Sequence, residues 1–128
     1  MTCDIEEADL ECVIPEFYRR VRANDQIGPL FNTVIEDWPH HLDRLIAFWS
    51  SVMLTSGRYK GSPMAAHLKH RDAINPAMFE CWLRLWDEVT GELLSDAAAR
   101  AMQAKAQTIG ESLKLALFFR LEPKGAAA

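Results

Sequence analysis

Three helix starts divide the chain and restrict it to helices of short and medium length. Asp37, Ser62 and Asn75 are residue types that cap helix N-termini, and a proline follows each of them within two positions. Proline fits the first turn of a helix because a backbone N–H in that turn has no partner within the helix. No segment shows the alternation of apolar and polar residues that is typical of half-buried strands. The sequence therefore predicts an all-α protein.

The spacing of apolar residues sets the expected extent of each helix. Val13, Phe17 and Val21 recur every fourth residue and define the buried face of the first helix. The buried face of a later helix is expected to run from Phe79 to Leu93. Helices are expected at about 5–23, 28–32, 38–54, 63–71, 76–92 and 97–121. We expect one domain over residues 1–121 and a disordered tail over residues 122–128.

Composition and charge narrow the classes of partner. Hydrophobic residues make up 49% of the chain and charged residues 25%, which is the balance of a soluble globular protein. The net charge of −4 offers no basic surface to nucleic acid or to an anionic membrane, and no apolar run is long enough to span a bilayer. Cys3, Cys12 and Cys81 have no metal-type spacing and are expected to be free thiols. Because the N-terminal stretch is acidic and lacks an apolar signal segment, we expect a cytoplasmic protein.

Four polar side chains fall on otherwise apolar helix faces. Tyr18, His41, His67 and Trp82 come from four separate predicted helices. Each could be a core residue with one hydrogen bond, and the local context of His67 alone favours that interpretation. An unsatisfied buried polar group costs about 1–3 kcal/mol, so burying all four favours a shared partner between them. A haem would provide such a partner because its iron needs one axial imidazole and its opposite side needs few polar groups.

Two interpretations without haem stay open at this point. The four histidines could form a non-haem metal site with nearby carboxylates, although the segment around His67 has no carboxylate at ligand spacing. The chain could also be a structural or partner-binding helical domain. The residues involved in the metal alternative are His40, His41, His67, His70, Glu36, Asp37 and Asp43.

The order and spacing of six short motifs resemble the truncated haemoglobins. These motifs are Phe17-Tyr18-x-x-Val21-Arg22, Gly28-Pro29-Leu30-Phe31, Trp38-x-x-His41, Phe48-Trp49, Tyr59-x-Gly61-x-Pro63-x-x-x-His67 and Phe79-Glu80-x-Trp82-Leu83. The combination of His41 with Trp82 resembles group III of that family, and the resemblance covers about residues 13–120. The Gly-Gly pairs of other groups are absent here, where Gly57 and Gly61 stand singly.

The resemblance implies a fold, a cofactor and a set of site residues. The implied fold is the two-over-two helical sandwich, and the implied cofactor is a haem b whose iron is bound by His67. Tyr18, His41 and Trp82 match the residues that face a bound gas. The apolar walls of the haem site would come from Phe31, Leu45, Phe48, Met64, Leu68 and Phe79. His70 and Arg71 would lie near the haem propionates.

The resemblance also implies a function with one main alternative. The expected activity is reversible binding of O₂, and of CO and NO, at the haem iron. The alternative is a haem redox enzyme that performs NO dioxygenation or peroxidase-type chemistry. Such an enzyme needs an external reductase as its partner, because this chain has no room for a reductase domain.

Overall fold

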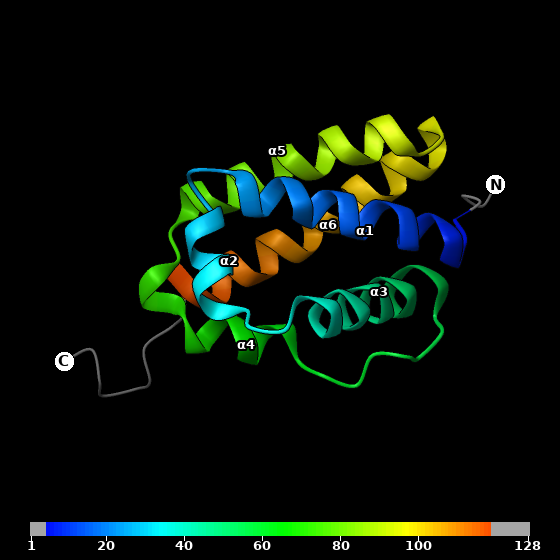
Figure 1. Cartoon of the computed structure of the whole chain (residues 1–128). Coiled ribbons are helices and arrows are strands. Elements are labelled where there is room, and N and C mark those ends of the chain that lie inside the picture. Colours follow the sequence, from blue (N-terminus) through cyan, green and yellow to red (C-terminus); the bar gives the residue numbers. More distant parts are fainter. Residues whose placement is uncertain (1–4, 119–128) are drawn as a thin grey trace.

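The computed structural model describes residues 5–118, which form six α-helices and one short 3₁₀ turn (Figure 1). The helices are α1 (Glu7–Ala23), α2 (Gly28–Val34), α3 (Trp38–Leu54), α4 (Pro63–Lys69), α5 (Pro76–Leu93) and α6 (Asp96–Phe118), and the 3₁₀ turn is η1 (Arg71–Ala73). The all-α prediction is confirmed for this range. The expected end of the last helix at Leu121 and the expected tail at 122–128 lie outside the described residues.

The three predicted helix starts are all present. The side-chain oxygens of Asp37, Ser62 and Asn75 each accept a hydrogen bond from the backbone N–H three residues later, at 3.2, 3.2 and 3.0 Å respectively. A cap of this kind stabilises a helix by about 0.5–2 kcal/mol. The Ser62 cap matters most for the site, because α4 is only seven residues long and carries His67. A helix this short depends on its cap and on packing against its neighbours.

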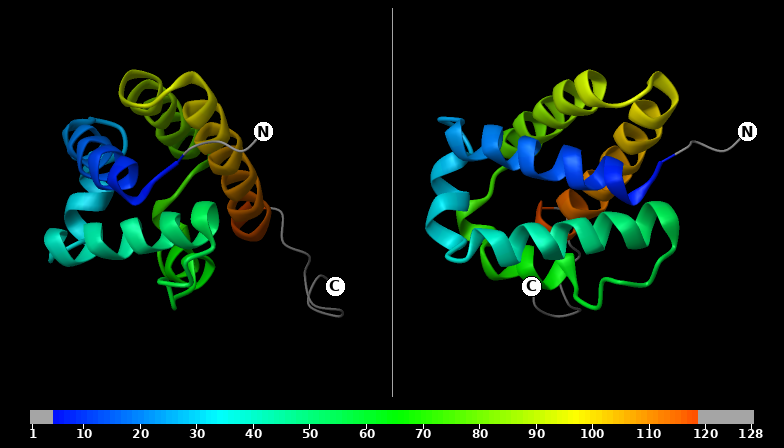
Figure 2. Two further views of the ribbon diagram at one scale, coloured as in Figure 1. Left: turned by 90° about the vertical axis from the view of Figure 1, so that its right-hand side faces the viewer. Right: turned by 45° about the vertical axis from the view of Figure 1, so that its right-hand side comes forward.

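The helices are arranged as two pairs with α4 beside them. Helix α1 packs on α3 and on α5, and α6 runs back along α5 after a tight turn (Figure 2). Helix α4 packs against α6 and lies at the lower edge of the molecule in Figure 1, whereas α5 lies at the upper edge. Side chains from α1, α3, α4, α5 and α6 can therefore meet in the space between these helices.

Trp86 lies at the centre of the core. Its ring stacks on that of Trp49 with a centroid distance of 4.6 Å, and Phe17 packs edge-on against it at 4.8 Å. The Trp86 indole N–H donates a hydrogen bond to the backbone oxygen of Met102 at 3.1 Å. Because these residues belong to α3, α5, α1 and α6, one side chain joins four helices.

The prediction that Leu93 points inward is wrong. The side chain is 40% exposed, because Leu93 is the last residue of α5 and the chain turns there into α6. The next residue, Leu94, is the one that packs against the core.

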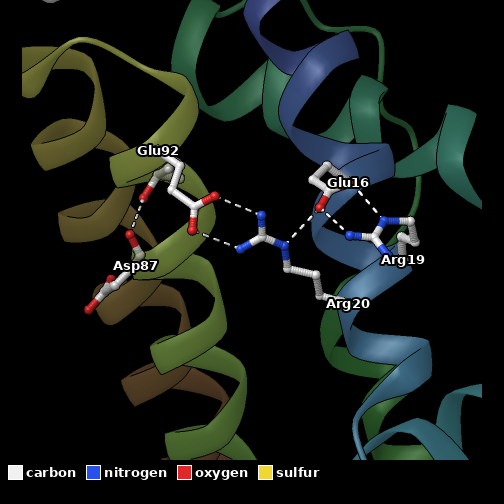
Figure 3. Close-up of polar contacts among 6 residues, drawn as sticks. Glu16, Arg19, Arg20, Asp87 and Glu92 are labelled. Atoms are coloured by element: carbon white, nitrogen blue, oxygen red, sulfur yellow. Dashed lines mark hydrogen bonds and ion pairs between the residues drawn. The ribbon is translucent and has the colours of Figure 1, made fainter.

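An ion network joins α1 to α5 on the outer surface (Figure 3). The Arg20 guanidinium lies 2.7 Å from the Glu92 carboxylate and 2.8 Å from that of Glu16. Hydrogen bonds from Arg19 and Arg20 lower the pKa of Glu16 to about 2. The Arg20 side chain is only 25% exposed, and it connects the two helices.

Gly28 offers a test of how closely α2 approaches α1. A Cβ atom at Gly28 would lie 2.6 Å from the backbone oxygen of Arg22 and 3.0 Å from that of Val21, and backbone atoms cannot turn aside as a side chain can. Gly91, within α5, has no such neighbour within 4 Å. We expect Gly28→Ala to lower the free energy of unfolding by about 1–3 kcal/mol. Gly91→Ala should raise it by about 0.5–1 kcal/mol.

Urea unfolding followed by far-UV circular dichroism measures both changes. Equal stability of Gly28→Ala and the unaltered protein would contradict the close contact between α1 and α2.

Candidate functional site

The helices surround an apolar cavity of about 350 Å³. This volume lies within the range of small-molecule sites, roughly 300–1,000 Å³. Every described α-helix contributes to the lining. Nine of the predicted site residues line it: Tyr18, Phe31, His41, Leu45, Phe48, His67, His70, Phe79 and Trp82.

Three of the predicted site residues do not line this cavity. Leu68 is 37% exposed. Met64 packs instead into a small cluster with Phe79 and Leu113 beside the cavity. Arg71 is exposed, because α4 ends at Lys69 and the 3₁₀ turn that follows breaks the helical spacing used to place it.

His67 is held by its own helix. Its Nδ1 donates a hydrogen bond to the backbone oxygen of Pro63 at 2.7 Å. This bond fixes the tautomer in which Nε2 carries a lone pair and no proton. The ring also lies nearly parallel to that of Phe79, with centroids 6.4 Å apart. His67 therefore has an oriented imidazole with its second nitrogen available to a metal, which is the usual arrangement of a histidine ligand.

Tyr18 and Trp82 lie close together on two other helices, and both rings pack edge-on against Phe17, at centroid distances of 4.7 and 5.7 Å. Burial raises the pKa of Tyr18 to about 12, and the nearby Trp82 indole offsets only part of that increase. Tyr18 is therefore protonated at neutral pH. Its O–H can donate to an acceptor in the cavity.

His41 completes the polar side of the cavity. Its half-buried ring packs edge-on against Tyr18 and Trp38, at centroid distances of 6.1 and 5.4 Å. Burial lowers its pKa, and the positive charges of Arg44 and His40 lower it further. His41 is therefore neutral at neutral pH and can donate from one ring nitrogen.

Sequence reasoning left two cavity residues without a role, Arg44 and Tyr59. The Arg44 guanidinium lies 5.8 Å from the centre of the Tyr59 ring, and both side chains line the cavity. A Cβ atom at Gly61 would lie 2.5 Å from the Tyr59 hydroxyl and 2.7 Å from Arg44 Nη2, so this single glycine leaves room for both. The sequence indicated that Arg44 could reach the cavity only through its position three residues after His41 on α3. Arg58, by contrast, forms an ion pair with Glu7.

Two further findings concern the described part of the chain. Within residues 5–118, no three side chains of His, Cys, Asp or Glu come together as a metal site, so the non-haem alternative gains no support from the geometry. Among the helices in the same range, none has the length and apolar character needed to cross a membrane.

Comparison with known proteins supports the resemblance seen in the motifs. No family model matches the chain. A group 3 truncated haemoglobin of Campylobacter jejuni is 27% identical over 118 residues, which cover 89% of this chain and 92% of that protein. The crystal structure of a group III truncated haemoglobin from Campylobacter jejuni matches with a TM-score of 0.82 and 26% identity, over 95% of this chain and 100% of that one. The predicted two-over-two helical sandwich is thereby confirmed.

The lowered pKa of His41 predicts a loss of stability in acid. The unfolded chain has a histidine with the ordinary value of 6.5, whereas the folded protein resists protonation of His41. The stabilisation is complete above the unfolded value and is lost as the pH falls through the lower folded value. We expect the free energy of unfolding to fall between about pH 7.5 and about pH 5.5, and His41→Gln to reduce this fall.

Urea titrations of the two proteins at both pH values measure this difference. His40→Gln is the matched control because His40 is exposed to solvent on the same helix turn. An identical pH dependence in His41→Gln and the unaltered protein would show that His41 titrates freely.

Proposed function

We infer that this chain, which has the truncated haemoglobin fold and resembles group III members in sequence, binds one haem b in the cavity and uses it to bind O₂ reversibly. CO and NO are expected to bind at the same place. The observation that carries this proposal is the bond from His67 Nδ1 to the Pro63 oxygen, because it leaves Nε2 as a preformed ligand for haem iron.

The chemistry of the cavity lining supports a haem as its occupant. Its lining is mainly apolar, as the flat porphyrin requires, and it contains an oriented imidazole. A haem iron held by one imidazole supplies an open coordination position for a diatomic gas. The remaining chemistry comes from the side chains of this protein.

The ligand-facing residues would stabilise and shelter the bound gas. Tyr18 would donate its O–H to the gas, because its phenol is protonated and lines the cavity. His41 would supply a second donor, and the aromatic rings around it would exclude water. Removing water strengthens each of these hydrogen bonds, because the local dielectric constant falls.

Arg44 is the best-placed cation for the haem propionates. Unlike Arg71, it lines the cavity, and the Tyr59 hydroxyl approaches the same point near Gly61. His70 lines the cavity as well. We therefore propose Arg44, with Tyr59 and His70, as the propionate site in place of the expected role of Arg71.

A redox enzyme is the second candidate function. The support for it is that Tyr18, His41 and Trp82 bring three possible donors from three helices to one cavity. Several donors slow the release of a bound gas, which suits NO dioxygenation or peroxide reduction more than transport. Consumption of NO or peroxide in the presence of a cellular reductase would distinguish this function from simple oxygen binding.

Replacing His67 tests the haem proposal directly. His67→Ala should lose most of its haem, because no other imidazole in the cavity is oriented by a bond to its own helix turn. His40→Ala is the control, because His40 is exposed and does not line the cavity, and it should keep its haem. The ratio of Soret absorbance to protein concentration after gel filtration measures retention. Normal retention in His67→Ala together with loss in His70→Ala would move the iron ligand to His70.

Replacing Tyr18 tests the proposed donor. Tyr18→Phe should speed O₂ dissociation by about tenfold, which corresponds to the loss of one hydrogen bond to the bound gas. Stopped-flow displacement of O₂ by CO measures this rate. Thr33→Val removes an exposed hydroxyl outside the cavity lining and should leave the rate unchanged. An unaltered rate in Tyr18→Phe would assign the interaction to His41 or Trp82.

A further inference from the structure

A second hollow shares Tyr18 with the cavity described above. This outer groove has a volume of about 440 Å³ and is more open than the cavity. Its lining includes Tyr18, Arg19 and Arg22 from α1, Asn32 from α2, and Trp38 and Leu42 from α3. Tyr18 lines both hollows. The wall between them is therefore formed where α1 meets the first turns of α3.

Trp38 occupies this wall. On one side its ring packs against Tyr18, at a centroid distance of 6.1 Å, and edge-on against His41 at 5.4 Å. Its ring also faces Arg22, whose guanidinium carbon lies 4.5 Å from the ring centre. Trp38 thus contacts the two ligand-facing residues and also lines the groove.

Arg22 is itself held in place by α2. Its Nε donates to the Asn32 side-chain oxygen at 3.0 Å, and the Asn32 side-chain nitrogen donates to the Arg22 backbone oxygen at 3.1 Å. This reciprocal pair fixes the guanidinium over the indole, where the attraction between a cation and an aromatic face favours the closed position.

Trp38 can move more easily than the core tryptophans. It is half-buried and is the first residue of α3, so few groups of its own helix surround it. Trp49 and Trp86, by contrast, are 2% and 0% exposed and stack on each other. A rotation of Trp38 therefore displaces little of the core.

We propose that Trp38 is a gate through which small gases pass between the outer groove and the cavity, and that Arg22 and Asn32 hold this gate closed. This inference rests on the proposed function, because it concerns entry of the gas that the haem binds. Opening moves the indole away from Arg22 and uncovers the space between Tyr18 and His41. Arg22 and Asn32 are thus positioning residues that act through Trp38.

A gate leaves a particular kinetic signature. Weakening the closed position raises the open population, and entry and exit pass through the same opening. Both rate constants then increase by the same factor, while the equilibrium affinity stays constant. A residue that stabilises the bound gas would change the dissociation rate and the affinity together.

The experiment compares Arg22→Gln with Arg19→Gln in the haem-loaded protein. Arg19 also lines the groove but is bound to Glu16 on its own helix. CO association is measured after flash photolysis, and CO dissociation is measured by displacement with NO. Arg22→Gln should raise both rate constants about three- to fivefold with an unchanged ratio, and Arg19→Gln should alter neither.

A second readout follows the gate itself. The Trp38 indole N–H of the CO-bound protein gives its own NMR signal, and relaxation dispersion reports ring motion on the microsecond to millisecond timescale. Arg22→Gln should increase this exchange contribution. Trp38→Phe, which leaves a smaller ring in the wall, should reproduce the faster rates.

The possible outcomes separate this inference from the proposed function. A protein that takes up no haem would overturn both. Normal haem content with unchanged CO rates in Arg22→Gln would overturn the gate alone. A change confined to dissociation would show that Arg22 acts on the bound gas, and faster rates in Arg44→Gln only would place the entrance beside Arg44; either result would overturn the gate.

Discussion

The stack of aromatic rings around Trp86 is the interaction on which the rest of the structure depends. Trp86 stacks on Trp49 and lies parallel to Trp82, with centroid distances of 4.6 and 5.9 Å. Phe17 packs edge-on against both Trp82 and Trp86. The stack fixes Trp82 in the lining of the cavity, where Tyr18, the residue that follows Phe17, also lies. The apolar core therefore positions the polar side of the site, and the two cannot be altered independently.

Most of the fold could be predicted from local signals. The caps at Asp37, Ser62 and Asn75 needed only neighbouring residues, and the structure confirms all three. Leu93 was misplaced because its outward turn depends on how α5 meets α6, which periodicity does not describe. The helix expected over residues 63–71 ends at Lys69, because a 3₁₀ turn follows it. These differences fall at helix ends, where spacing carries least information.

The candidate site was predictable in its members but not in their connections. The sequence suggested Tyr18, His41, His67 and Trp82 because they are polar residues on apolar faces. It could not show that Trp82 and Tyr18 pack together around Phe17 or that burial raises the Tyr18 pKa to about 12, since both depend on contacts between distant helices. In the sequence, Arg44 is a cation three residues after His41, and no local pattern indicates what it binds. Its place beside Tyr59 follows from the path of the chain through Gly61.

The bond from His67 to Pro63 makes the start of α4 a self-contained unit. Ser62 caps the helix, Pro63 supplies the carbonyl, and His67 receives its orientation, all within one and a half turns. The orientation of the His67 ring is therefore set within α4, independently of the length of the preceding connection between α3 and α4. Relatives of this chain could lengthen or shorten that connection and still present the same imidazole, so it is where variation in sequence would be tolerated and where a reporter group or a partner-binding segment could be inserted.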